Sequence, residues 1–206
     1  MLVAAGMLFL PVSATAMEYQ KTGTVVYTQS VVNLRNTMRQ LWEDHIVYTR
    51  SFITSALAGL DDTGKVAERL LRNQDDIGNA IKPIYGDEAG KKLSALLRDH
   101  ILIAADIVAA AKAGDNDGVA KGQKRWTANA DDIAVFLSSA NPNWPVQKLK
   151  DMLYMHLAFT TTEVVSRLKK DWSADIEAYD KGHVHMLMFA DMLTDGIVKQ
   201  FPAKFK

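Results

Sequence analysis

The sequence contains no cysteine among its 206 residues. This absence excludes a disulfide, a thiol nucleophile, the covalent attachment of c-type haem and a lipid anchor on cysteine. Stability must therefore come from the packing of secondary structure or from a bound ligand.

The chain also has no net charge at pH 7, because its 24 Lys and Arg residues balance its 24 Asp and Glu residues. This balance gives no reason to expect nucleic acid or an anionic membrane surface as a partner. The GxSxG, GxGxxG, phosphate-loop and HExxH signatures are also absent, so no catalytic residue is identified. Whether the protein is an enzyme stays open, and a protein partner is equally unknown.

Residues 1–16 form an apolar stretch that ends in Ala14-Thr15-Ala16. An apolar run followed by a small-x-small sequence is typical of a secretory signal peptide, although no basic residue precedes it here. The run is shorter than the roughly 20 apolar residues of a membrane span, so we expect no transmembrane segment in the mature chain. We predict cleavage after Ala16 and a periplasmic or secreted protein, with a buried N-terminal helix as the alternative.

Hydrophobic residues recur at three- and four-residue spacing along six later segments, the pattern of a helix with one buried face. Segment 17–30 lacks this period and is predicted to be an extended lead-in. We expect Pro83 and Gly86 to end the second helix and Pro202 to end the sixth. The predicted helices cover about 31–57, 65–82, 87–113, 119–139, 145 to the turn at 169–171, and 173–200.

Two motifs repeat with nearly the same period. The first occurs as LWEDHI at 41–46, LLRDHI at 96–101 and, more weakly, LYMHL at 153–157; the second occurs as NQDDIG at 73–78 and NADDIA at 129–134, with a truncated third copy predicted at 173–176. Each unit is therefore a helical hairpin of about 55 residues, used three times. We predict an all-α fold for residues 31–206, a single up-down antiparallel bundle of about six helices.

Four histidines fall on the apolar stripes of different predicted helices. A buried imidazole needs a polar partner, and several inward imidazoles can share a metal ion. We therefore predict a transition-metal site, with the ion being iron, zinc, manganese or copper. Its candidate histidine ligands are His45, His100, His156 and His183.

Carboxylates accompany these histidines in the sequence. Glu163 follows His156 by two helical turns, Asp180 precedes His183 by one turn, and Asp191 follows in the same predicted helix. We include Glu163, Asp180 and Asp191 among the candidate metal ligands, since a mixed imidazole and carboxylate set suits iron, zinc or manganese. Nearby methionines would favour copper instead, but core packing explains them more simply.

A structural role is the alternative to metal binding. Asn73 and Asn129 occupy core positions of their predicted helices and need hydrogen-bond partners, which the histidines or acids can supply. On this interpretation a buried polar layer of His, Asn and Asp crosses the bundle and fixes the register of the helices in a structural or interaction module that binds no metal.

Three stretches carry a resemblance to a known family. They are 41–50 (LWEDHIVYTR), 73–81 (NQDDIGNAI) and the closing pair 190–193 (ADML) and 199–202 (KQFP). Together they resemble a family of exported, all-helical bacterial proteins of unknown function. The resemblance implies export and a helical fold, and it assigns no functional residue.

Overall fold

The structure, a computed structural model, describes residues 27–206. Within this range the chain is helical and contains no strand, which confirms the predicted all-α class. The six helices are α1 (Gln29–Ala58), α2 (Thr63–Tyr85), α3 (Asp87–Ala113), α4 (Asn116–Ala140), α5 (Val146–Leu168) and α6 (Trp172–Gln200), followed by the 3-10 turn η1 (Pro202–Phe205).

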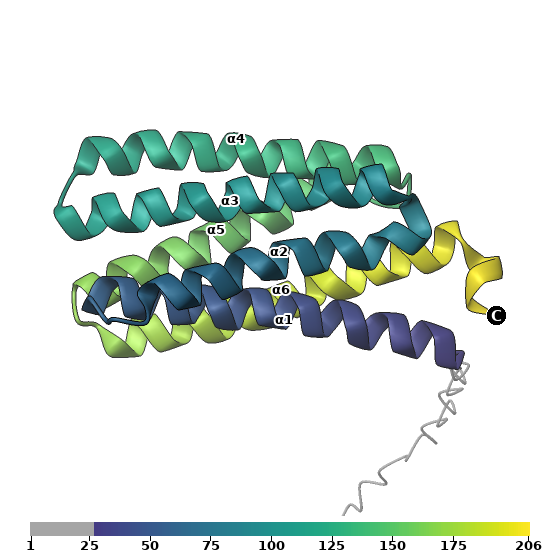
Figure 1. The fold of residues 1–206 in the computed structure, drawn as a ribbon, viewed down its shortest axis with the longest axis horizontal. Coiled ribbons are helices and arrows are strands. Elements are labelled where there is room, and N and C mark those ends of the chain that lie inside the picture. Colours follow the sequence, from purple (N-terminus) through teal and green to yellow (C-terminus); the bar gives the residue numbers. More distant parts are fainter. Residues whose placement is uncertain (1–26) are drawn as a thin grey trace, which may run out of the picture.

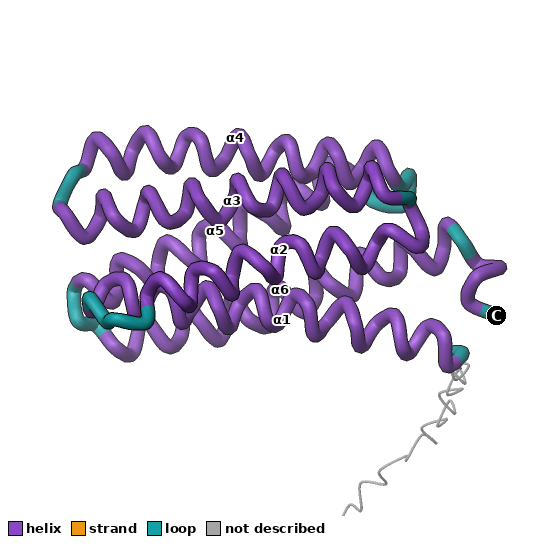
Figure 2. The backbone as a smooth tube through the Cα atoms, viewed as in Figure 1, coloured by secondary structure: helices purple, strands orange, loops and turns teal. Residues whose placement is uncertain are grey.

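Successive helices run antiparallel and are joined by short connections at the two ends of the molecule (Figures 1 and 2). Each helix packs against its neighbour in sequence, and α6 returns to pack against α1. Helix α1 also touches α3 and α5 across the interior. The three predicted hairpins therefore close into a ring around one core.

The expected signal peptide and most of the expected lead-in lie outside the described residues. The last two residues of that lead-in, Gln29 and Ser30, already belong to α1. The hydroxyl of Thr28 accepts a hydrogen bond from the backbone N–H of Val31, so Thr28 caps the helix and sets its start.

Two other helix boundaries also differ from the prediction. Helix α2 continues through Pro83 to Tyr85 and ends only at Gly86. Helix α4 begins three residues earlier than expected, because the Asp115 carboxylate accepts a hydrogen bond from the backbone N–H of Gly118 and caps it. Pro83 was expected to stop α2 and only Gly86 does so, while the apolar pattern that predicted the start of α4 marks the buried face of a helix rather than its ends.

One continuous apolar core joins all six helices. Its fully buried members include Ile77, Leu97, Ile133, Leu149 and Phe189, one or more from each of α2 to α6. None of the helices between residues 27 and 206 is both long enough and apolar enough to span a membrane.

Helices α2 and α3 approach each other closely at a pair of glycines. A Cβ atom at Gly78 would lie 2.5 Å from the carbonyl oxygen of Gly90, and one at Gly90 would lie 2.6 Å from that of Gly78. Only residues without a side chain allow the two backbones to meet in this way. Toward the other end of the molecule the two helices diverge (Figure 1).

We predict that Gly78→Ala lowers the free energy of unfolding by about 1–3 kcal/mol, because the new methyl group must push α3 away from α2. Gly64→Ala is the matched control, since a Cβ at Gly64 has no neighbour within 4 Å. It should be neutral or slightly stabilising, as Ala favours helix over Gly. Urea denaturation of both variants tests this, and equal stability of the two would contradict the close approach.

Candidate functional site

Three of the five histidines meet in the interior of the bundle. His45 of α1, His100 of α3 and His156 of α5 are each no more than 3% exposed. The Nε2 atoms of His45 and His156 are 3.4 Å apart. The ring of His100 stacks on that of His156, with the centroids separated by 6.0 Å. We call these three residues the imidazole layer.

The repeat explains why these side chains converge. In the first hairpin the side-chain N–H of Asn73 donates to the carbonyl oxygen of Leu41 at 3.0 Å. In the second, Asn129 donates to Leu96 at the same distance. Each carbonyl belongs to the residue four positions before the layer histidine. The same contact therefore fixes each pair of helices in the same register.

The third hairpin makes the equivalent contact with a different residue. The Nε2–H of His185 donates to the carbonyl oxygen of Met152, four positions before His156, at 2.8 Å. His185 lies 56 residues after Asn129. The third copy of the second motif is thus centred on His185, and not at 173–176 as predicted; applying the same shift to Asn129 would have found it.

Asn129 also determines which nitrogen of His100 carries the proton. Because its amide nitrogen donates to Leu96, its oxygen faces His100, and the Nδ1 to Oδ1 distance is 2.7 Å. The oxygen can only accept, so Nδ1 is the protonated nitrogen. In the neutral ring Nε2 therefore carries the free lone pair.

Gln74 occupies a similar position beside His45. Its amide nitrogen donates to the carbonyl oxygen of Leu70 at 2.8 Å and to Asn73 Oδ1 at 3.1 Å. The Gln74 Oε1 atom and the His45 Nδ1 atom are both buried, and neither has a hydrogen-bond partner. No hydrogen bond of ordinary geometry joins the two atoms to each other. Sequence analysis did not single out Gln74, because nothing in its own helix shows that it faces a histidine on α1.

All three layer imidazoles are neutral at pH 7. Burial, with a smaller contribution from the nearby His100, lowers the pKa of His45 to about 3, and the Gln74 amide opposes this shift. Burial also lowers the pKa of His100 to about 4, against the hydrogen bond with Asn129. For His156, burial and the neighbouring imidazoles hold the pKa well below its usual value.

The other predicted ligands lie elsewhere. His183 does not reach the interior: its Nε2 lies 3.3 Å from Glu43 Oε1, with 28% of its side chain exposed. Asp180 is exposed at the surface of α6. Asp191 accepts hydrogen bonds from Arg39 and forms an ion pair with Arg35 at 3.1 Å, so it joins α6 to α1.

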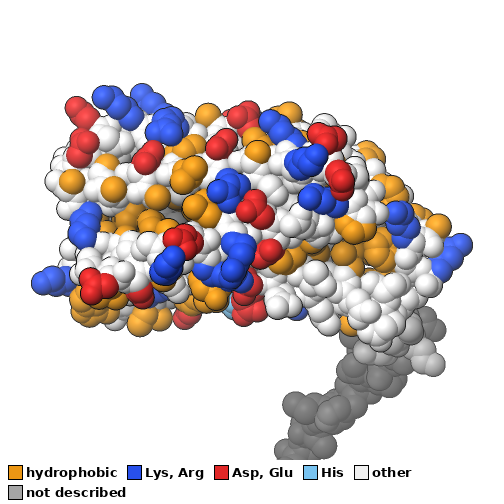
Figure 3. Space-filling model, in the orientation of Figure 1, with side chains coloured by type: hydrophobic (Ala, Val, Ile, Leu, Met, Phe, Trp, Pro, Cys, Tyr) orange, Lys and Arg blue, Asp and Glu red, His pale blue; other side chains and the backbone are white. Residues whose placement is uncertain are grey.

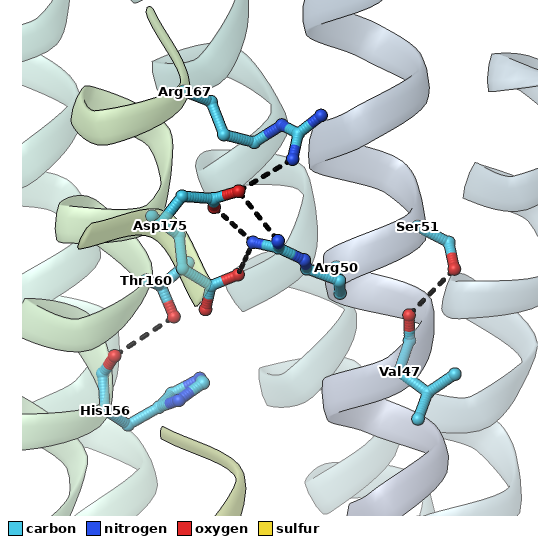
Figure 4. A network of polar contacts seen from close by, with 8 residues as sticks. Val47, Arg50, Ser51, His156, Thr160, Arg167 and Asp175 are labelled. Atoms are coloured by element: carbon cyan, nitrogen blue, oxygen red, sulfur yellow. Dashed lines mark hydrogen bonds and ion pairs between the residues drawn. The ribbon is translucent and has the colours of Figure 1, made fainter. Parts of the chain in front are cut away.

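Glu163 belongs to a buried ion cluster at the end of the bundle where α5 turns into α6. It accepts from Arg50 at 3.1 Å, and Arg50 also binds both carboxylate oxygens of Asp175 (Figure 4). Arg167 donates to the same Asp175 carboxylate at 2.8 Å. Burial raises the pKa of Glu163 to about 7, although the hydrogen bond from Arg50 opposes the shift.

The methionines do not gather around the imidazole layer as a set. Met152 and Met186 are buried in the apolar core, whereas Met155 and Met188 are exposed. Core packing therefore accounts for the first pair.

Among residues 27–206, no group of three or more His, Asp or Glu side chains is placed to hold a metal ion. What the fold brings together is a layer of three neutral imidazoles, with an amide side chain bonded to one and another beside a second. Comparisons of the chain with protein-family models, curated proteins and solved structures found no match.

The lowered pKa values predict how stability depends on pH. An unfolded histidine takes up a proton near pH 6.5, while the layer histidines stay neutral to about pH 4 or below. Acidification from pH 6.5 therefore favours the unfolded chain, by up to about 1.4 kcal/mol per pH unit for each layer histidine. Urea denaturation at a series of pH values should show this loss.

The titration of Glu163 changes the pH dependence of stability in the opposite direction to that of the histidines. Its raised pKa means that the folded state binds a proton between about pH 7 and pH 4.5 that the unfolded chain does not, which stabilises the fold as pH falls. Glu163→Gln removes this effect, so the loss of stability on acidification should become steeper. His100→Phe should make it shallower, and an unchanged slope would contradict a neutral buried His100.

Proposed function

We propose that this protein is an exported helical bundle that binds a transition metal ion at the imidazole layer. The observation that carries the proposal is the 3.4 Å separation of His45 Nε2 and His156 Nε2. Two imidazole nitrogens bound to one tetrahedral zinc ion, at about 2.0–2.1 Å each, lie roughly 3.3 Å apart. In this proposal His45 and His156 hold the ion directly, and His100 would have to move toward them to supply a third nitrogen, since the three are not grouped around one point as they stand.

The amides beside the histidines support the same proposal. A metal-binding histidine usually donates its second N–H to an oxygen, which fixes the ring and leaves the other nitrogen free to bind. Asn129 plays this part for His100, and Gln74 is placed to do so for His45. The low pKa values of His45 and His100 also support the proposal, since neutral imidazole is the form that binds a metal.

An all-imidazole set narrows the choice of metal. Glu163, Asp180 and Asp191 are engaged elsewhere or exposed, so none of these three predicted carboxylates joins the layer. Imidazole ligands suit zinc, copper, iron or nickel, whereas manganese prefers carboxylate oxygens. Zinc and copper are therefore the ions to test first.

The first prediction under this proposal concerns metal content. The full-length protein, purified without a metal-binding tag, should contain close to one metal ion per chain by elemental mass spectrometry. His100→Ala should lose the ion because it removes a ligand. His183→Ala is the control, since His183 lies outside the layer, and it should retain the ion.

A second candidate function, a purely structural polar layer, is favoured by the repeated contact of Asn73, Asn129 and His185 with backbone carbonyls. It predicts a metal-free protein that takes up no zinc, copper, iron or nickel on titration. It also predicts that His100→Ala lowers stability and changes nothing else. That combined outcome would refute the metal proposal.

Asn129 has two contacts, one that orients His100 and one that joins α4 to α3, and a further prediction distinguishes their effects. Asn129→Leu should weaken metal affinity by roughly 10–100-fold, because the Nδ1–H of His100 loses its acceptor. Asn73→Leu is the matched control: it removes the same type of contact to a carbonyl, and because its oxygen accepts from Gln74 and not from a histidine, it should weaken metal affinity less than Asn129→Leu. Equal loss of metal affinity in both variants, measured by competition with a chelating dye, would count against a positioning role.

A further inference from the structure

A second feature of the interior, a narrow apolar cavity, does not depend on the metal proposal. The space that the centre of a water molecule can occupy inside it is about 60 Å³, and the cavity lies between α1, α3, α4 and α5. On α3 it is lined from Ile101 to Ala111, a span of about 15 Å along the helix axis. The cavity is therefore long and thin, and much smaller than the roughly 300–1,000 Å³ of sites for drug-sized ligands.

The divergence of α2 from α3 opens this space. The two backbones meet at Gly78 and Gly90, and on the other side of the molecule only Leu70 of α2 reaches the cavity wall. Figure 3 shows a hollow with hydrophobic side chains at the end of the molecule where α1, α3 and α5 finish. Val165 of α5 lines the cavity and is 40% exposed, which gives the cavity a route to the surface.

The inner end of the cavity reaches the imidazole layer. Trp126 lines it, and its ring lies against His100 with centroids 5.2 Å apart. Thr49, one helical turn beyond His45, also lines it. The Nε1 atom of Trp126 and the hydroxyl of Thr49 are both buried without a hydrogen-bond partner. Trp126 itself is 3% exposed, so its N–H donor is fully withdrawn from water.

These features define the chemistry of a ligand. The carbon lining of the cavity and its length along α3 fit a hydrocarbon chain. The indole N–H of Trp126 and the hydroxyl of Thr49 both lack a partner, and a ligand oxygen that reached them at the inner end would supply one. No charged side chain lines the cavity in the described part of the chain, so an anionic head group would stay unpaired there.

We propose that this cavity binds an unbranched aliphatic molecule that carries one neutral polar oxygen, such as a primary alcohol, with the oxygen bonded to Trp126 Nε1 and Thr49 Oγ1. The chain extends from the imidazole layer toward the opening at Val165. Binding supplies the two missing hydrogen bonds and fills the space that the diverging helices leave.

The test is a calorimetric titration of the full-length protein, freed of metal by a chelator, with 1-butanol, 1-hexanol, 1-octanol and 1-decanol. We expect one saturable site whose affinity rises with chain length until the cavity is filled. Octane and the octanoate anion, which match 1-octanol in length, should bind more weakly. Absence of saturable binding by every alcohol, or octanoate binding as tightly as 1-octanol, would overturn the proposal.

Three variants locate the site. Ala104→Leu fills the cavity from α3 and should abolish binding of 1-octanol, whereas Ala109→Leu makes the same change on the exposed face of α3 and should bind normally. Thr49→Val removes the hydroxyl at nearly constant shape and should weaken 1-octanol about threefold to tenfold while leaving octane unchanged. Unchanged 1-octanol affinity in folded Ala104→Leu would place the binding elsewhere and refute the assignment.

A measurement on the unaltered protein keeps the test decisive if Ala104→Leu does not fold. The indole N–H resonance of Trp126, assigned by comparison with Trp126→Phe, should shift on titration with 1-octanol and stay unchanged with octanoate. A resonance that does not move at saturating 1-octanol would refute the proposed hydrogen bond. Because all titrations use metal-free protein, failure here leaves the metal proposal standing, and failure of the metal proposal leaves this one standing.

Discussion

The burial of three imidazoles in an apolar core is the constraint on which the rest of the interior depends. A buried imidazole loses its hydration and must remain neutral, so each ring has one nitrogen that donates and one that accepts. The surrounding groups follow from this requirement: Asn129 accepts from His100, while His45 and His156 face each other through their Nε2 atoms. The layer thus provides nitrogen lone pairs and keeps its rings unprotonated.

Much of the fold could be predicted from the sequence, because it depends on patterns within single helices and on one repeat length. The apolar period gave the six helices, and the return of His45 as His100 and His156 gave the three hairpins and the interior position of these rings. Asn129 was also expected to find a polar partner in the core, and the structure gives it His100.

The composition of the candidate site could not be predicted in the same way. A position on an apolar stripe shows which side of one helix a residue occupies, but whether residues on different helices meet depends on how each helix is rotated and shifted against its neighbours. Asp191 was expected near the histidines, yet two arginines of α1 bind it at the rim of the bundle. Glu163 likewise pairs with Arg50 through a long-range contact that no local pattern contains. Export and metal binding stay predictions.

The contact between α6 and α1 has a consequence for the connectivity of the fold. Because the last helix packs beside the first, the hydroxyl of Thr28 reaches the carbonyl oxygen of Phe205 at 2.6 Å. The two ends of the described chain are therefore neighbours, and the ring of helices has no structurally distinct starting point. A circular permutant, joined between these ends and opened in the connection at 141–145, would keep every helix next to its present neighbours, in keeping with the tolerance of domains whose termini lie close together.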